Sequence, residues 1–102
     1  MAGSNTRDEF NEERTAFLEG FAANVRRARA EHRDEPLSQS DLFKKADLHR
    51  TEISRIETAK SEPRLLTLVI LADALGVTLD DLVADLPVPK TRKPASGREE
   101  RP

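Results

Sequence analysis

Apolar residues recur at helical spacing in five separate stretches of this chain. The first stretch covers residues 16–33, and shorter ones lie at about 38–47, 49–58, 64–75 and 78–86. Polar segments, several of which contain proline or glycine, separate these stretches from one another. The pattern predicts an all-α domain of five helices over residues 16–86.

Local signals mark the ends of several of these helices. Ser38, followed three residues later by Asp41, predicts an N-cap with an acidic partner, as in a capping box. Asp47 stands where the chain must bend, and aspartate tolerates left-handed backbone better than most residues. We expect Gly76 to end the helix over 64–75 as its C′ residue. Residues 78–81 are expected to cap the last helix.

The segment from residue 38 to residue 58 predicts two short helices joined by a tight turn. On a helical wheel of about 100° per residue, Ile53 and Ile56 share one side of the second helix. Thr51 and Arg55 point the opposite way, and Arg50 lies near the N-terminal end. A supporting helix followed by an arginine-bearing helix at a fixed angle is the geometry that enters a DNA major groove.

Two extensions flank the predicted domain. Residues 1–15 are expected to be partly helical or disordered, and either continue the first helix or form an arm. The acidic content of this segment argues against an arm that contacts DNA. Residues 87–102 contain prolines among lysine, arginine, serine and glycine, so we expect a flexible, disordered tail. Gly20 inside the first helix costs up to about 1 kcal/mol relative to alanine, and a break or a close helix contact is expected there.

The composition fits a single small domain. The chain has 102 residues, of which 36% are hydrophobic and 35% are charged. It has no cysteine, which excludes a disulfide framework and a thiolate metal site. No apolar run approaches the about 20 residues that span a bilayer, and the N-terminus lacks the apolar core of a signal peptide. We expect a cytoplasmic protein with no membrane partner.

The sequence gives no support for catalysis. His32 and His49 lie far apart without carboxylates at ligand spacing, so no metal site is expected. Ser38 and Ser54 have neither the nucleophile-elbow setting nor a base that a hydrolase needs. There is no glycine-rich phosphate loop. We expect no enzymatic activity and no cofactor.

The charge of the chain limits how it could bind nucleic acid. Its 17 lysines and arginines are outnumbered by 19 aspartates and glutamates, which gives a net charge of −2. Binding to DNA must therefore depend on local charge and on specific geometry rather than on a basic surface. Four arginines, at positions 26, 27, 29 and 33, cluster on the first helix.

Over about residues 21–86 the chain resembles the lambda-repressor-like (Xre/Cro-type) helix-turn-helix family. The resemblance includes Leu37-Ser38-Gln39, Leu42, Ile53-Ser54-Arg55-Ile56-Glu57, Pro63, Leu68, Leu71-Ala72, Ala74-Leu75-Gly76-Val77 and Leu79-Asp80-Asp81-Leu82. The run Leu48-His49-Arg50-Thr51 and the small size resemble the controller proteins of restriction–modification systems, although phage repressors and solitary regulators fit as well. Phe43 and Asp47 depart from the family, which usually has alanine and glycine there, so the packing of the two motif helices is expected to differ.

The resemblance implies a sequence-specific transcriptional regulator that binds a pseudo-palindromic operator in double-stranded DNA as a homodimer. It implies base contacts from the recognition helix at about 49–58, through Arg50, Thr51, Glu52 and Arg55. It implies phosphate contacts from Ser38, Gln39, Ser54, Lys60, Ser61 and Arg64. It also implies a structural ion pair between Arg29 and Glu57. The expected dimer interface consists of Val69, Ile70, Leu79, Leu82, Val83 and Leu86.

A protein-interaction module is the alternative interpretation. In that case the same fold would bind a protein partner, as an antitoxin binds its toxin, and the near-neutral charge would be the indication. A salt series distinguishes the two functions, because specific DNA binding weakens steeply with salt. Specific DNA binding would also be lost in Arg55→Ala.

Overall fold

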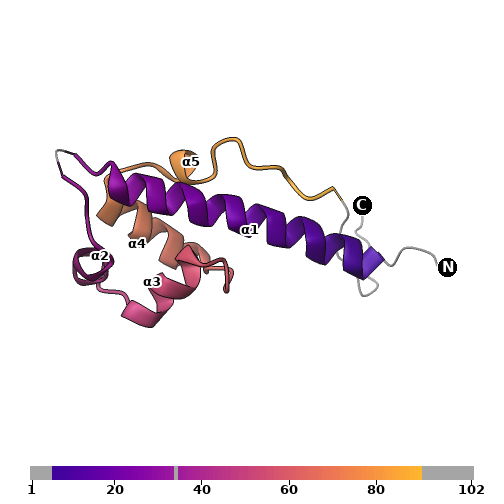
Figure 1. Ribbon diagram of the computed structural model, residues 1–102, viewed down its shortest axis with the longest axis horizontal. Helices are drawn as coiled ribbons and strands as arrows, with labels where there is room; N and C mark the ends of the chain where they lie inside the picture. Colours follow the sequence, from indigo (N-terminus) through magenta and orange to yellow (C-terminus); the bar gives the residue numbers. More distant parts are fainter. Residues whose placement is uncertain (1–5, 34, 91–102) are drawn as a thin grey trace.

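Five α-helices form the fold of the computed structural model, which describes residues 6–33 and 35–90. They are α1 (Thr6–Ala30), α2 (Gln39–Ala46), α3 (Arg50–Glu57), α4 (Leu65–Leu75) and α5 (Leu79–Leu82) (Figure 1). No strand occurs in these two ranges, so the predicted all-α class and the five helices are confirmed. Helix α3, predicted over about 49–58, begins one residue later and ends one residue earlier than expected.

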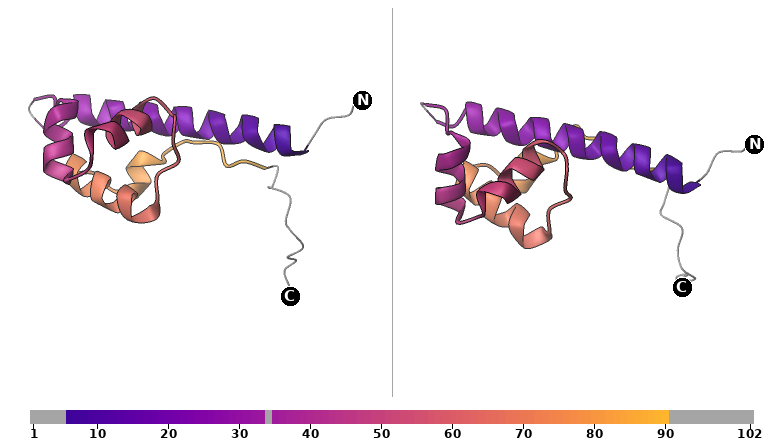
Figure 2. Two further views of the ribbon diagram at one scale, coloured as in Figure 1. Left: turned by 90° about the horizontal axis from the view of Figure 1, so that it is seen from below. Right: turned by 60° about the horizontal axis from the view of Figure 1, so that its bottom comes forward.

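Helix α1 is longer than the helix predicted to begin at Ala16. It runs without a break from Thr6 to Ala30, so residues 6–15 continue it, and it ends before the expected Arg33. At about 1.5 Å per residue its 25 residues span about 37 Å. Figures 1 and 2 show that its N-terminal half projects beyond the cluster of α2, α3 and α4. Residues 1–5 of the predicted extension lie outside the described residues.

Gly20 does not interrupt α1, but it is a site of close contact. A Cβ atom at this position would lie 2.6 Å from Cδ2 of Leu86. Of the two expectations for Gly20, a helix break or a close contact, the structure shows the close contact, which is with Leu86. It allows the segment that follows α5 to pack directly on α1.

The core lies between the C-terminal half of α1 and the four shorter helices. Helix α3 packs on α1 and α2, α2 packs on α4, and α5 joins α1 to α4. Every helix contributes buried apolar side chains to one cluster, whose largest members are Phe21, Val25, Leu42, Ile53, Ile56, Leu71, Leu75 and Leu82. Because the apolar side of α3 packs into this core, Arg50, Thr51 and Arg55 on its opposite side remain exposed.

The position of Leu82 corrects the predicted dimer interface. Its side chain is 1% exposed and belongs to the core of the monomer, so it is not available to a second copy. The reason is that α5 has only four residues and lies across α1 and α4, which turns Leu82 inward. Leu79 and Leu86 are half-buried and also pack against the core, whereas Val83 is exposed.

Caps form at the expected positions of α2, α4 and α5. The Ser38 hydroxyl accepts a hydrogen bond from the backbone N–H of Asp41 at 2.9 Å. Asp47 adopts left-handed backbone at φ 57° and ψ 38°, and Gly76 ends α4 at φ 74°. Residues 78 and 81 form a complete capping box, with reciprocal hydrogen bonds of 3.1 and 3.0 Å. These local signals therefore fix where α2, α4 and α5 begin or end.

The chain after α5 returns along the N-terminal half of α1 (Figures 1 and 2). Pro89 lines a hollow there together with Phe10 and Phe17 of α1. The predicted tail beyond Lys90 lies outside the described residues. None of the helices in the described part of the chain has the length and apolar character needed to cross a membrane.

Candidate nucleic-acid interface

The turn between α2 and α3 sets the position of the predicted reading helix. Asp47 reverses the chain in left-handed backbone, and its N–H bonds to the carbonyl of Phe43. The chain then extends through Leu48 to His49, the N-cap of α3, whose backbone has φ −65° and ψ 140°. Helix α3 thus begins three residues after Asp47, at Arg50.

Helix α3 has one buried and one exposed side, as its sequence predicts. Ile53 and Ile56 are buried in the core. Arg50, Thr51 and Arg55 are exposed to solvent. Apolar burial therefore anchors the helix while its guanidinium and hydroxyl groups remain accessible.

A buried carboxylate fixes the C-terminal end of α3. Glu57 is 3% exposed and accepts from Arg29 twice, from Nε at 2.7 Å and from Nη2 at 2.9 Å. The amide of Gln39 donates to the same carboxylate at 2.8 Å. The ion pair expected between Arg29 and Glu57 is present, and Gln39 connects it to the start of α2. One carboxylate therefore joins α1, α2 and α3.

Arg26 has a role that the sequence did not indicate. Its Nη1 atom donates to the backbone carbonyl of Glu57 at 2.6 Å, which satisfies an acceptor at the end of α3. A cation at a helix C-terminus is also favoured by the helix dipole. The spacing of three residues between Arg26 and Arg29, which places both on one side of α1, is the signal that could have revealed it.

Five of the ten predicted DNA-contacting residues meet in one open hollow beside α3. Thr51, Glu52 and Arg55 line it from the helix, and Ser61 and Arg64 line it from the loop before α4. His49, Glu62 and Pro63 complete the lining. The Glu62 carboxylate accepts from Nε of Arg14 at 3.0 Å, and this ion pair offsets its negative charge at the rim of the hollow.

Glu52 is held in place within this hollow. Its Oε2 atom accepts a hydrogen bond from the Thr67 hydroxyl of α4 at 3.3 Å, and its side chain is half-buried. A fixed carboxylate presents an acceptor at a defined position on the exposed side of α3.

The other predicted phosphate contacts are distributed elsewhere. Lys60 is exposed in the loop after α3, next to the hollow. Ser38 is exposed at the start of α2, where its hydroxyl caps the helix. Gln39 is half-buried, and its amide donates to Glu57. Ser54 is half-buried on α3. The structure therefore places these residues at three points around the motif rather than in one cluster.

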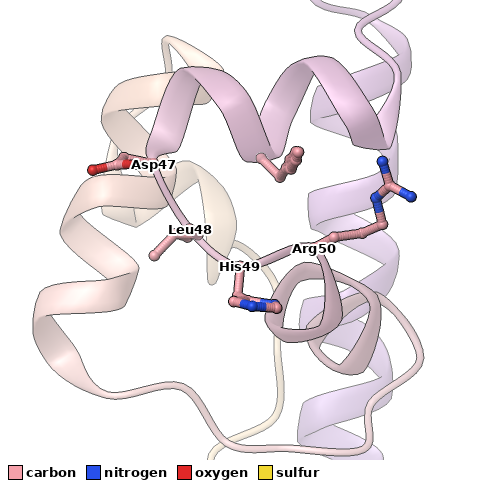
Figure 3. A pocket seen from close by; sticks show the side chains of 5 residues that line it. Asp47, Leu48, His49 and Arg50 are labelled. Atoms are coloured by element: carbon pink, nitrogen blue, oxygen red, sulfur yellow. The ribbon is translucent and has the colours of Figure 1, made fainter.

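A second open hollow lies at the turn between α2 and α3. It is lined by Phe43, Asp47, Leu48, His49 and Arg50 (Figure 3). The guanidinium carbon of Arg50 lies 5.1 Å from the centre of the Phe43 ring. His49 lines both hollows, so the two are neighbours on the surface of the motif.

Within residues 6–33 and 35–90, no group of three or more histidine, aspartate and glutamate side chains is placed to hold a metal ion. The chemistry that the site offers consists of hydrogen-bond donors and acceptors on an exposed helix. Its guanidinium groups match the paired acceptors of guanine in the major groove.

The family model described as "Helix-turn-helix" matches residues 37–82 of this chain, which is the segment from the start of α2 to the end of α5. The chain carries a lambda-repressor-like helix-turn-helix domain. Its exposed α3 stands at the position of the second helix of the helix-turn-helix motif. This segment is similar to the DNA-binding domains of Xre-type regulators.

Two solved structures are similar to this helix-turn-helix protein. One is the restriction–modification controller protein C.AhdI from Aeromonas hydrophila, with 26% identity and a TM-score of 0.58. That match covers 64% of this chain and 94% of the controller protein. The other is the hypothetical transcription factor NHTF from Neisseria, with 26% identity, a TM-score of 0.61, and coverage of 76% and 80%. No curated protein sequence matches the chain significantly.

Proposed function

We propose that this helix-turn-helix protein reads a pseudo-palindromic operator as a homodimer, with α3 of each copy in the major groove. The observation that carries the proposal is the exposure of Arg50, Thr51 and Arg55 on a helix whose inner side is anchored in the core. The pair of Arg29 and Glu57 holds that helix at a fixed angle to α1. A rigid helix with exposed guanidinium groups is suited to base reading.

Each proposed base contact follows from the chemistry of its side chain. Arg50 and Arg55 can each donate two hydrogen bonds to O6 and N7 of a guanine, and such a pair contributes about 1–3 kcal/mol of discrimination. The methyl group of Thr51 can contact a thymine methyl. Glu52, positioned by Thr67, can accept from a cytosine amino group or orient Arg55.

The phosphate contacts are proposed for both sides of the recognition helix. Lys60, Ser61 and Arg64 would hold one stretch of DNA backbone beyond the end of α3. Ser38 and Gln39 would hold another at the start of α2, and Ser54 would flank the reading side of α3. These contacts position the protein without reading sequence.

The homodimer is proposed to form through the exposed apolar face of α4 and Val83. Val69, Ile70 and Val83 are 44%, 37% and 40% exposed, and Leu65 and Leu66 extend the apolar face to the start of α4. Large apolar side chains exposed together favour burial against a partner. Leu79 and Leu86 can contribute only their exposed edges. A second copy would place two recognition helices about one DNA turn, or about 34 Å, apart.

Selection from a random pool of DNA duplexes tests the proposal directly. The protein should enrich one pseudo-palindromic sequence, and Arg55→Ala should bind that duplex about 5- to 150-fold more weakly, because one bidentate guanine contact is lost. Arg27→Ala is the matched control, since it removes an exposed arginine of α1 away from the motif. Equal binding by wild type and Arg55→Ala would contradict the assignment.

A salt series separates phosphate contacts from base contacts. Arg64→Ala should reduce the slope of log affinity against log salt by about 1 per bound subunit and weaken all duplexes alike. Arg55→Ala should instead relax the sequence preference at one position. If no duplex is enriched by the wild type, the protein-interaction module becomes the better proposal, and the net charge of −2 favours that alternative.

A further inference from the structure

We propose that Phe43, on α2, makes an additional contact with a DNA base, beside the contacts proposed for α3. The hollow at the turn would take the C5-methyl group of a pyrimidine next to the guanine that Arg50 reads. This inference rests on the proposed function, because it assumes that α3 enters the major groove. It adds to that function a base contact from α2. It also predicts that the operator contains a two-base step in which a C5-methylated pyrimidine stands beside a guanine.

The first observation is the contact between Phe43 and Arg50. The guanidinium carbon lies 5.1 Å from the ring centre, within the range of a cation–π interaction. An arginine stacked on a ring keeps the N–H groups of its planar edge free, and its conformational freedom is reduced before DNA binds. Phe43 therefore positions Arg50 for a bidentate contact with guanine.

The second observation is the lining of the hollow. Phe43 and Leu48 are half-buried and supply apolar surface, while His49 and Arg50 are exposed beside them. Figure 3 shows that Asp47, Leu48, His49 and Arg50 follow one another from the end of α2 to the start of α3. Among the groups on a base edge in the major groove, only the C5-methyl group is apolar, and phenylalanine is one of the side chains that contact it.

The third observation is the charge at the rim. Asp47 is exposed and lines the same hollow, and its carboxylate would repel a phosphate group. A neutral base edge is therefore a better occupant than the DNA backbone.

Replacing thymine by deoxyuracil removes only the methyl group, so this exchange tests the proposal without changing the protein. The probe is the duplex most enriched by the wild type, with one thymine replaced at a time. At the thymine beside the Arg50 guanine, wild-type binding should weaken about fourfold, the effect expected for one buried methyl group. In Phe43→Ala the same replacement should have no effect.

Two further variants separate the roles of the side chains. Thr51→Ser removes the other methyl-contacting group, so it should leave the uracil effect at the Phe43 position unchanged. Phe43→Leu keeps apolar surface but has no ring, so it should retain most of the uracil effect while the preference for the adjacent guanine declines. Phe43→Leu also keeps most of the packing of the half-buried ring. It therefore provides a folded variant for the test if Phe43→Ala unfolds.

The same assay shows whether the hollow accepts the methyl group of thymine alone or also that of 5-methylcytosine. With cytosine at the sensitive position, binding should be weak, and 5-methylcytosine should recover it if every C5-methylated pyrimidine is accepted. Failure of 5-methylcytosine to recover binding assigns the hollow to thymine. The inference is overturned if replacing thymine by deoxyuracil weakens wild type and Phe43→Ala equally. It is also overturned if no such replacement next to a guanine weakens wild-type binding. If Arg55→Ala still weakens binding in that case, the proposed function stands without it.

Discussion

At the scale of single residues, the orientation of the recognition helix depends on one carboxylate. Glu57 receives hydrogen bonds from Arg29 and Gln39, and its backbone carbonyl receives one from Arg26. A buried charge is costly unless it is paired and hydrogen-bonded, and here its partners come from two other helices. The ion pair therefore acts as a brace between helices rather than as a DNA contact.

Glu57→Ala should lower the free energy of unfolding by about 3 kcal/mol, because the half-buried Arg29 guanidinium and the Gln39 amide both lose their partner. Urea denaturation followed by circular dichroism measures the change. Arg14→Ala is the control: it breaks the ion pair of Arg14 with Glu62, whose side chains are 42% and 64% exposed. That variant should cost less than about 1 kcal/mol. Similar costs for both variants would show that the brace is not specifically stabilising.

Gly76 is a second residue with a defined physical requirement. Its φ of 74° lies in the left-handed region, and no atom lies within 4 Å of a Cβ added there. Gly76→Ala should therefore destabilise by about 1–2 kcal/mol through backbone strain alone. The midpoint of urea denaturation should fall, while sequence preference in DNA binding remains that of the wild type. An unchanged midpoint would mean that the end of α4 relaxes without cost.

At the scale of elements, the short helix α5 is held at both ends. The Thr78 and Asp81 capping box satisfies its N-terminus. Asn24 of α1, which is 7% exposed, donates to the carbonyl oxygens of Leu82 at 2.9 Å and Ala84 at 3.3 Å. A helix of four residues has little stability of its own, so these contacts and the burial of Leu82 determine its position.

Asn24→Ala should weaken the attachment of α5 to α1 and cost about 1–3 kcal/mol, because two buried or half-buried carbonyl groups lose their donor. Amide hydrogen exchange should become faster in α5 and in residues 83–86 than in α3, which keeps its own contacts. Uniform acceleration across all helices would contradict a local role for Asn24.

Element boundaries illustrate what could be predicted and what could not. The starts of α2 and α5 followed from Ser38 and Thr78, because a capping side chain acts on backbone three residues away. The burial of Ile53 and Ile56 followed from helical spacing. The partners of Asn24 could not be predicted in this way, since they lie 58 and 60 residues further along the chain.

At the scale of the whole molecule, one apolar face remains uncovered. Leu65 and Leu66 are 71% and 70% exposed, and Val69 and Ile70 lie one turn further along α4. Ile70→Asp should convert the proposed dimer to a monomer, because a carboxylate in an apolar interface loses its hydration. Sedimentation velocity at several protein concentrations measures the change. Ala16→Asp, which adds the same charge to an exposed position of α1, is the matched control.

The loss of the dimer should also weaken binding to the full pseudo-palindrome much more than binding to a half-site. The reason is that two linked recognition helices bind with a high effective concentration. A wild-type protein that sediments as a monomer at every concentration, and that binds half-site and full site equally, would contradict the homodimer.

The sequence by itself determined the positions of α2 to α5, the caps of α2, α4 and α5, and the two-sided character of α3, because each depends on residues within one or two turns. It also indicated the Arg29–Glu57 pair through the family resemblance. The tertiary structure alone decided that Leu82 faces inward, that Gly20 receives Leu86, and that Phe43 lies against Arg50. These contacts join residues on different elements, and their geometry depends on how the helices pack rather than on local spacing.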